Sequence, residues 1–134
     1  MTKTNRNLHD ARKNKNDEYY TRIEDIEKEI PNYDLTGMWV YSPCDDYRWS
    51  KFKEYFVSNF TELGIRHYTC TNYDLGEGAF RYDYDGSGET ITRLVGDGDY
   101  ASPECTAIRD EADIIITNPP FSKWRAFFKW IQEG

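Results

Sequence analysis

The chain of 134 residues has no long apolar run, and this absence excludes two classes of protein. Without about 18 consecutive apolar residues, the sequence predicts no membrane-spanning helix. The N-terminus is polar and lacks the apolar stretch of a secretory signal. Only 38% of the residues are hydrophobic, but 16% are aromatic, whereas disordered proteins are poor in aromatics. The length predicts one globular domain, and the aromatic content predicts that its core is rich in aromatic side chains.

Cysteine and histidine are also scarce. The three cysteines, Cys44, Cys70 and Cys105, lie far apart, and no two of them have C-x-x-C spacing. An odd number of scattered cysteines argues against both a disulfide framework and a zinc site. We therefore expect reduced thiols in a cytoplasmic protein, and we assign neither His9 nor His67 to a metal.

The net charge of −7 is unevenly distributed along the chain. Residues 1–16 hold five basic residues and one acidic residue, a net charge of +4, so the remainder carries −11. We interpret residues 1–16 as a flexible basic arm, either a solvated tail or a segment that contacts a nucleic-acid backbone. The acidic body is by itself a poor surface for phosphate groups.

Sequence patterns predict an α/β fold with a mostly parallel sheet. Residues 38–41 and 65–71 resemble buried strands, and between them Ser50 begins a helix that Gly64 ends. A strand, a helix and a second strand in this order indicate a parallel pair joined by a right-handed crossover. Residues 113–117 form a further core strand with isoleucine on both faces, as a sheet covered on both sides requires.

Other segments complete this fold. Residues 79–95 alternate apolar and polar side chains around a D-G-S-G turn, which predicts an antiparallel hairpin inserted between the parallel elements. Thr21 and Glu24 form a capping box for a helix that Pro31 ends. Two more helices are expected, at residues 103–110 and after Ser122.

Acidic and amide side chains follow each predicted parallel strand. Asp45 follows the first strand, Asp74 the second and Asn118 the last, and Asp97 lies in the loop before the last strand. Because open parallel sheets bind ligands at the carboxyl ends of their strands, these residues predict a binding site. The alternative is that each of them only ends a strand and starts a turn.

The last predicted strand ends in the tetrapeptide Asn118-Pro119-Pro120-Phe121. This N-P-P-F ending resembles the active-site motif of DNA methyltransferases that modify amino groups. In that family a flipped adenine presents its amine to the asparagine side chain and to a backbone carbonyl beside the first proline. An amide oxygen accepts without bringing charge, prolines fix the backbone, and an aromatic ring can stack on the extruded base. The resemblance implies that all four residues are catalytic.

Four segments in order, KNDEYYTRIEDIEKEI, CDDYRWSKFKEYF, GDGDYASPEC and ADIIITNPPFS, together resemble the EcoRI-type adenine-specific DNA methyltransferases. The resemblance covers essentially residues 13–131. It implies S-adenosyl-L-methionine as cofactor, double-stranded DNA with a flipped adenine as substrate, and a place in restriction–modification. The cofactor-binding residues that it implies are Tyr19, Tyr20 and Thr21 at the methionine end, Cys44 and Asp45 in the first loop, Asp74 at the ribose and Asp97 at the adenine ring.

The resemblance also implies a Rossmann-like methyltransferase fold with strand order 3-2-1-4-5-7-6. The first loop, S-P-C-D-D, departs from the usual F-x-G-x-G. Family members continue well past N-P-P-F, so we expect an N-terminal half, truncated after the fourth core strand. Residues 17–134 would then form a partial methyltransferase catalytic domain with an open edge strand.

Two other interpretations remain open. The chain could be a non-enzymatic acidic module, either a DNA mimic or one subunit of a split methyltransferase whose sheet a second chain completes. The aspartates near 45–46 and 97–99 could instead hold Mg²⁺ in a nuclease, although no lysine completes a nuclease pattern beside them. We therefore expect no metal site.

Overall fold

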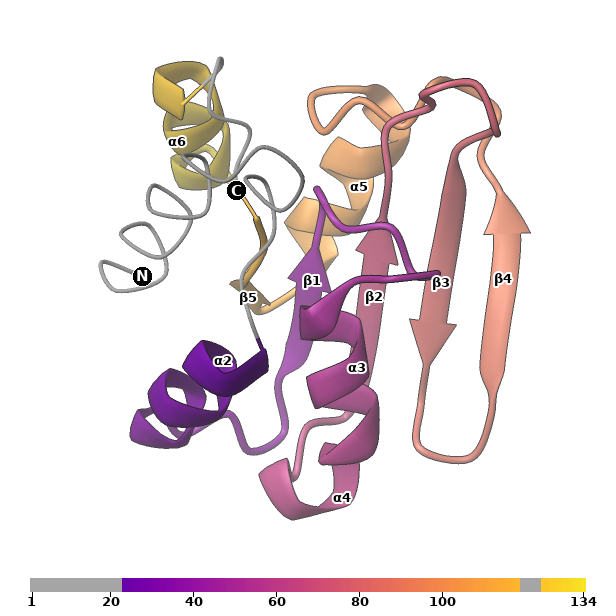
Figure 1. Ribbon diagram of the computed structural model, residues 1–134. Helices are drawn as coiled ribbons and strands as arrows, with labels where there is room; N and C mark the ends of the chain where they lie inside the picture. The colour runs from indigo at the N-terminus through magenta and orange to yellow at the C-terminus, as the bar shows by residue number, and fades with distance from the viewer. Residues whose placement is uncertain (1–22, 119–123) are drawn as a thin grey trace.

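The computed structural model describes residues 23–118 and 124–134, and they form a mixed α/β fold around one five-stranded sheet. The strand order is β4-β3-β2-β1-β5 (Figure 1). β1 (Trp39–Ser42) lies between β2 (His67–Thr71) and β5 (Ile114–Ile115), and it pairs with both in parallel. This arrangement confirms the α/β class and is compatible with a methyltransferase-like fold. The sheet is mixed, however, and not mostly parallel as predicted, because two of its four strand pairs are antiparallel.

The crossover between β1 and β2 confirms the predicted strand–helix–strand unit. α3 (Lys51–Ser58) begins at Ser50, whose side chain accepts a hydrogen bond from the Lys53 backbone N–H. The single helix predicted here is wrong, because the structure has α3 and then the short α4 (Phe60–Leu63). The break falls at Asn59, whose side-chain nitrogen donates to the Tyr55 carbonyl over 3.0 Å. Short amide side chains compete in this way with the helical backbone bonds.

Gly64 ends α4 as predicted, in a left-handed conformation with φ of 71°. A side chain is disfavoured there, so glycine is the natural residue for this position. The chain then turns directly into β2.

The predicted hairpin is confirmed. β3 (Phe80–Tyr84) pairs antiparallel with β4 (Glu89–Arg93), and β3 also pairs antiparallel with β2. The hairpin therefore extends the sheet beyond β2, and β4 is one edge with all five residues exposed.

β5 is shorter than predicted. Residues 113–117 were expected in the strand, but only Ile114 and Ile115 pair with β1 as regular strand. Backbone bonds continue on both sides, from Asp113 N–H to the Trp39 carbonyl at 2.9 Å and from Ile116 N–H to the Tyr41 carbonyl at 3.0 Å. The segment thus follows β1 up to the start of the Asn118 motif.

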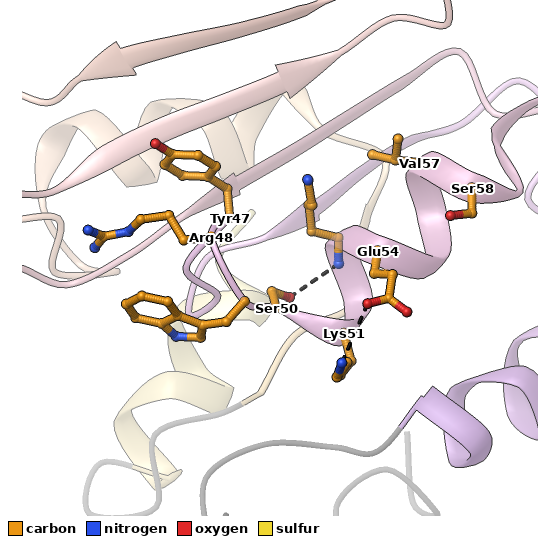
Figure 2. A pocket seen from close by; sticks show the side chains of 9 residues that line it. Tyr47, Arg48, Ser50, Lys51, Glu54, Val57 and Ser58 are labelled. Carbon is orange, nitrogen blue, oxygen red and sulfur yellow. Dashed lines mark hydrogen bonds and ion pairs between the residues drawn. The ribbon is translucent and has the colours of Figure 1, made fainter.

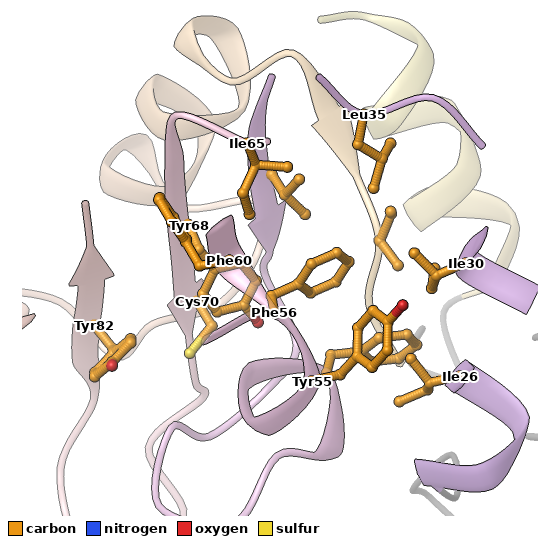
Figure 3. Packing of buried hydrophobic residues seen from close by; sticks show 13 residues of the cluster. Ile26, Ile30, Leu35, Tyr55, Phe56, Phe60, Ile65, Tyr68, Cys70 and Tyr82 are labelled. Carbon is orange, nitrogen blue, oxygen red and sulfur yellow. The ribbon is translucent and has the colours of Figure 1, made fainter. Parts of the chain in front are cut away.

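Helices cover both faces of the sheet. Side chains of α2 (Ile23–Glu29), the following 3-10 turn η1 (Ile30–Asn32), α3 and α4 pack on one face, where six of the thirteen buried residues of the described cluster are aromatic (Figure 3). On the other face Tyr41 packs with side chains of α5 (Pro103–Glu111) and α6 (Trp124–Gln132). These layers leave the carboxyl ends of β1 and β2 at one edge of the molecule (Figure 1).

The starts of the first and last predicted helices, at Thr21 and Ser122, lie outside the described residues. The helix predicted at 103–110 is confirmed as α5, which Ser102 caps by accepting from the Cys105 backbone N–H. None of the three cysteines forms a disulfide. Across the described ranges, no helix has the length and apolar character needed to cross a membrane.

Candidate active site

The carboxyl edge of the sheet brings two of the predicted site residues into contact, and a third lies in the loop after the neighbouring strand. Asp45 follows β1, and its backbone N–H donates to the carbonyl of Thr71, the last residue of β2, over 3.0 Å. Asn118 follows β5, and it bonds to Asp45 directly. Asp74 lies in the loop after β2. Parallel strands place their following loops together in this way.

Asp45 is the buried centre of this region, with 1% of its surface exposed. Its Oδ1 accepts from the Ser50 hydroxyl at 2.8 Å and from the Asn118 side-chain nitrogen at 2.6 Å. Its Oδ2 accepts from the Thr117 hydroxyl and from the Asn118 backbone N–H, the latter at 3.1 Å. Each carboxylate oxygen therefore receives two donors, and all four donors are neutral groups.

The two hydroxyl groups that face Asp45 also accept hydrogen bonds from the backbone. The Ser50 oxygen accepts from the Lys53 N–H at 3.2 Å, and the Thr117 oxygen accepts from the Cys44 N–H at 2.9 Å. A backbone N–H can only donate, so it occupies one lone pair of each hydroxyl oxygen and leaves the hydroxyl hydrogen available to donate to Asp45. The network is therefore one of donors around an acceptor, which is the arrangement an ionised carboxylate needs.

Burial and hydrogen bonding act on the Asp45 carboxyl group in opposite directions. Burial raises the pKa of Asp45 above its ordinary value, and the bonds from Thr117, Asn118 and Ser50 oppose that rise. Desolvation disfavours the charged form, while donated hydrogen bonds favour it. The net pKa is raised, so burial is the larger effect.

Asp74 and Asp97 lie in two loops that are joined to each other. The Asp74 N–H donates to the Asp97 carbonyl at 2.7 Å. The loops approach so closely that a Cβ on Gly98, which has φ of +77°, would lie 1.9 Å from the Asn72 carbonyl oxygen. Glycine is thus required at 98 by both backbone conformation and space. The structure brings Asp74 and Asp97 together, as a shared site needs.

The Asp74 carboxylate differs in character from that of Asp45. Its Oδ1 accepts from the backbone N–H groups of Gly76 and Gly78 at 2.8 and 2.9 Å, and these bonds lower the pKa of Asp74. Asp74 is half-buried and Asp97 is exposed, so a ligand can reach both side chains. Their carboxylate oxygens can accept hydrogen bonds from hydroxyl or amino groups of a nucleoside.

The other predicted site residues are distributed as follows. Cys44 is half-buried and precedes Asp45, and its backbone N–H donates to the Thr117 hydroxyl oxygen. The remaining ones lie outside the described residues, so their predicted roles stay predictions; they are Tyr19, Tyr20, Thr21, Pro119, Pro120 and Phe121. Within the ranges that are described, no group of three or more His, Cys, Asp or Glu side chains is placed to hold a metal ion.

A hollow of about 380 Å³ lies elsewhere, along the first turns of α3 (Figure 2). Arg48, Trp49, Lys53 and Ser58 are among its lining residues. Among its described lining residues, Ser50 donates to Asp45 and Lys53 donates to Ser50, but neither Asp45 nor Asn118 lines it. We therefore centre the candidate site on Asn118 at the edge of the sheet.

Sequence reasoning missed the residues that hold Asp45. Thr117 directly precedes the N-P-P-F motif, and Ser50 was assigned only as a helix cap. The sequence offers one usable signal, because both positions carry hydroxyl residues beside elements that end or begin at the carboxyl edge.

Comparison with known proteins now identifies the family. The family model described as adenine-specific methyltransferase EcoRI matches residues 7–89 and 81–133. The chain belongs to this family. The resemblance stated from the motifs is thereby confirmed, and it extends over nearly the whole chain. The comparison with solved structures found no match to the chain.

Individual relatives agree with this assignment. The Type II methyltransferase M.EcoRI of Escherichia coli is 34% identical over 92% of this chain and 44% of its own length. The Type II methyltransferase M.MgeORF184P of Mycoplasma genitalium is 34% identical over 87% of this chain and 38% of its own length. A Mycoplasma pneumoniae relative, M.MpnI, is 33% identical over 87% of this chain and 37% of its own length. The chain thus spans less than half the length of each of these relatives.

Proposed function

We propose that this EcoRI-family chain carries the cofactor- and amine-binding part of a site-specific DNA methyltransferase. Its reaction would be transfer of a methyl group from S-adenosyl-L-methionine to the exocyclic amine of adenine. The observation that carries the proposal is the position of Asn118. This residue follows a strand at the carboxyl edge and bonds to Asp45 in the loop after β1, within one connected network that reaches β2.

Asn118 would act on the adenine amine by accepting one of its hydrogens. The amide oxygen is a neutral acceptor, so it can draw on the amine without bringing a full charge into a buried site. Asn118 is only 4% exposed, and in such surroundings a hydrogen bond is stronger than in water. A second acceptor is proposed in the backbone at Pro119, with Pro120 keeping the turn rigid and Phe121 stacking on the base.

The acceptor set on the neighbouring loops fits the proposed cofactor. Asp74 would receive the two ribose hydroxyls, and its lowered pKa keeps it ionised for that task. Asp97 would face the adenine ring, and Tyr19, Tyr20 and Thr21 would surround the methionine end. S-adenosyl-L-methionine supplies an activated methyl group when bound. The contribution of the protein is to align the amine with that methyl, and such alignment can account for much of a rate enhancement.

Double-stranded DNA with one adenine flipped out is the proposed substrate, in the setting of restriction and modification. The acidic body makes a weak phosphate surface, so the basic residues 1–16 are proposed to contact the DNA backbone. The cytoplasm is the proposed compartment, in keeping with three cysteines that are not in disulfides.

Methyl transfer from labelled S-adenosyl-L-methionine to DNA tests this proposal, with calorimetry of cofactor binding alongside. Asn118→Ala should reduce methylation on the order of 100-fold or more and leave the cofactor affinity within about twofold, because the lost interaction is with the amine. Asn32→Ala, an exposed asparagine in η1, is the matched control and should behave as wild type. If folded wild type gives no binding heat even at millimolar cofactor, the proposal is wrong.

A second candidate is a subunit whose sheet a partner chain completes. The observation in its favour is the position of β5, which forms an edge of the sheet next to β1. Unpaired strand edges are templates for a further strand. Gel filtration with light scattering tests this candidate, since it requires a stable complex that a proline at Ile115 abolishes.

A further inference from the structure

The hydrogen bonds around Asp45 fix which end of the Asn118 amide faces away from it. Asp45 Oδ2 receives the Asn118 backbone N–H, a donor that cannot be reversed. Asp45 Oδ1 receives the Asn118 side-chain nitrogen at 2.6 Å and the Ser50 hydroxyl at 2.8 Å. Because a carboxylate accepts with both oxygens, the amide of Asn118 must present its NH₂ end to Asp45.

The planar amide of Asn118 carries its nitrogen and its oxygen at opposite ends. Holding the nitrogen against Asp45 therefore directs the oxygen away from this carboxylate. An asparagine turned the other way would present donors to an adenine amine, which itself has hydrogens to donate. The choice of amide orientation is thus the difference between an attractive and a repulsive contact.

We propose that Asp45 is a positioning residue, which holds the Asn118 amide with its oxygen toward the methyl-accepting amine. This proposal rests on the proposed function of Asn118. It gives Asp45 a role other than the cofactor contact that the family resemblance implies. The carboxylate is 1% exposed, and both of its oxygens already bond to groups of the protein. A cofactor hydroxyl would have to displace one of these buried donors.

The variant Asp45→Asn makes a sharp test, because the existing donors dictate how the new amide must lie. The Asn118 backbone N–H requires an oxygen at the Oδ2 position, so the new NH₂ group must take the Oδ1 position. That position faces the Asn118 side chain. Two NH₂ groups cannot bond to each other, so Asn118 should rotate its amide and direct its NH₂ outward. Ser50 can accept from the new NH₂, so the fold should persist.

Nuclear magnetic resonance of the ¹⁵N-labelled full chain reads this orientation without any need for activity. The Asn118 side-chain NH₂ signal is assigned by its loss in Asn118→Ala. In wild type we expect one downfield-shifted, slowly exchanging hydrogen, and in Asp45→Asn we expect this pattern to be lost. Asp46→Asn is the matched control, since Asp46 bonds to Arg48 through both oxygens. An unchanged Asn118 signal in Asp45→Asn would overturn the proposal.

Methylation kinetics give the functional arm. Asp45→Asn should lower kcat on the order of 100-fold while the cofactor affinity stays within about twofold of wild type. The exchanged pair, Asp45→Asn with Asn118→Asp, restores one acceptor and one donor between the two positions, so it should recover part of the kcat lost in either single variant. Lost cofactor affinity with unchanged kcat, or no recovery in the exchanged pair, would contradict a positioning role.

The two arms separate the failure of this inference from that of the proposed function. A wild-type chain that binds no cofactor and methylates no DNA would contradict the function, and the Asn118 signal would still decide whether Asp45 orients the amide. If the wild type is active but the Asn118 signal does not change in Asp45→Asn, the proposed function is retained and the positioning role of Asp45 is excluded.

Discussion

Asp45 and Asp83 are both largely buried carboxylates that collect several donors, yet their pKa values move in opposite directions. Asp83, in β3, accepts from Arg81 Nε at 2.8 Å and from the Thr69 hydroxyl at 2.7 Å, and His67 contacts it at 2.7 Å. Burial raises the pKa of Asp83, but the bonds from Arg81, Thr69 and His67 outweigh it and the net pKa is lowered. For Asp45 burial prevails and the pKa is raised.

The difference lies in the depth of burial and in the charge of the donors, since Asp45 is 1% exposed whereas 16% of the Asp83 side chain is exposed. Arg81 gives Asp83 a charged partner, whereas the donors to Asp45 are hydroxyl and amide groups. A nearby cation favours the ionised form more than a neutral donor does. Asp83 therefore helps to hold β3 against β2 as a stabilising element. Burial makes the ionised form of Asp45 costly, and carboxylates kept at such a cost are typical of functional sites.

Removing each carboxylate should produce the largest contrast between the two regions. Asp45→Ala leaves buried donors of Ser50, Thr117 and Asn118 unsatisfied, and we expect a loss of about 3 kcal/mol in the free energy of unfolding. Asp83→Ala leaves donors that are nearer to solvent, and we expect about 1 kcal/mol. Urea unfolding followed by circular dichroism measures both. Equal losses of stability would show that the donors around Asp45 depend on its carboxylate no more than those around Asp83 depend on theirs.

Two helix caps sharpen the comparison at a smaller scale. Ser50 caps α3 and also donates to Asp45, whereas Ser102 caps α5 by accepting from Cys105 N–H. Ser102→Ala should cost about 1 kcal/mol of stability, the usual value for a lost cap. Ser50→Ala should cost about 2 kcal/mol, because it also removes a bond to a buried carboxylate. Thermal unfolding of both variants measures the difference between their losses of stability. A difference near zero would show that the Ser50–Asp45 hydrogen bond does not contribute to stability.

Structural features that depend on neighbouring residues could be predicted from the sequence, whereas contacts between distant residues could not. Ser50 as a cap, Gly64 as a helix end and the 79–95 hairpin depend on neighbours in sequence, and all three were predicted correctly. The break at Asn59 was missed because the apolar spacing gives no sign of the hydrogen bond from the Asn59 side chain to the Tyr55 carbonyl.

The site shows the same limit. Placing Asp45 and Asn118 at one edge followed from the parallel topology that the sequence indicates. That their side chains bond to each other did not follow, because 73 positions separate them and only the β1–β5 pairing sets their distance. Asp45 was consequently assigned to the cofactor by family resemblance. The pairing of Asp83 with Arg81 has a closer origin, since the two residues lie on the same face of one strand.

Acidification should change the contributions of the two aspartates to stability in opposite directions. These effects should be smaller than those of the carboxylate and helix-cap substitutions. The folded pKa of Asp83 lies below its unfolded value of about 3.9, so its contribution to stability is complete above that pH and is lost as the pH falls through the folded pKa. The folded pKa of Asp45 lies above its unfolded value. Its ionised form therefore opposes folding at neutral pH, and this opposition is relieved as the pH falls through the folded pKa.

Urea unfolding of wild type, Asp83→Asn and Asp45→Asn between about pH 7 and pH 3 measures these signs, since the range brackets the ordinary carboxyl pKa. The stability advantage of wild type over Asp83→Asn should shrink as the pH falls. Wild type should instead gain stability relative to Asp45→Asn, because protonation removes a buried charge that the variant lacks at every pH. If both differences moved in the same direction, a common donor environment would govern the two carboxylates, and the contrast between charged and neutral partners would not be the cause.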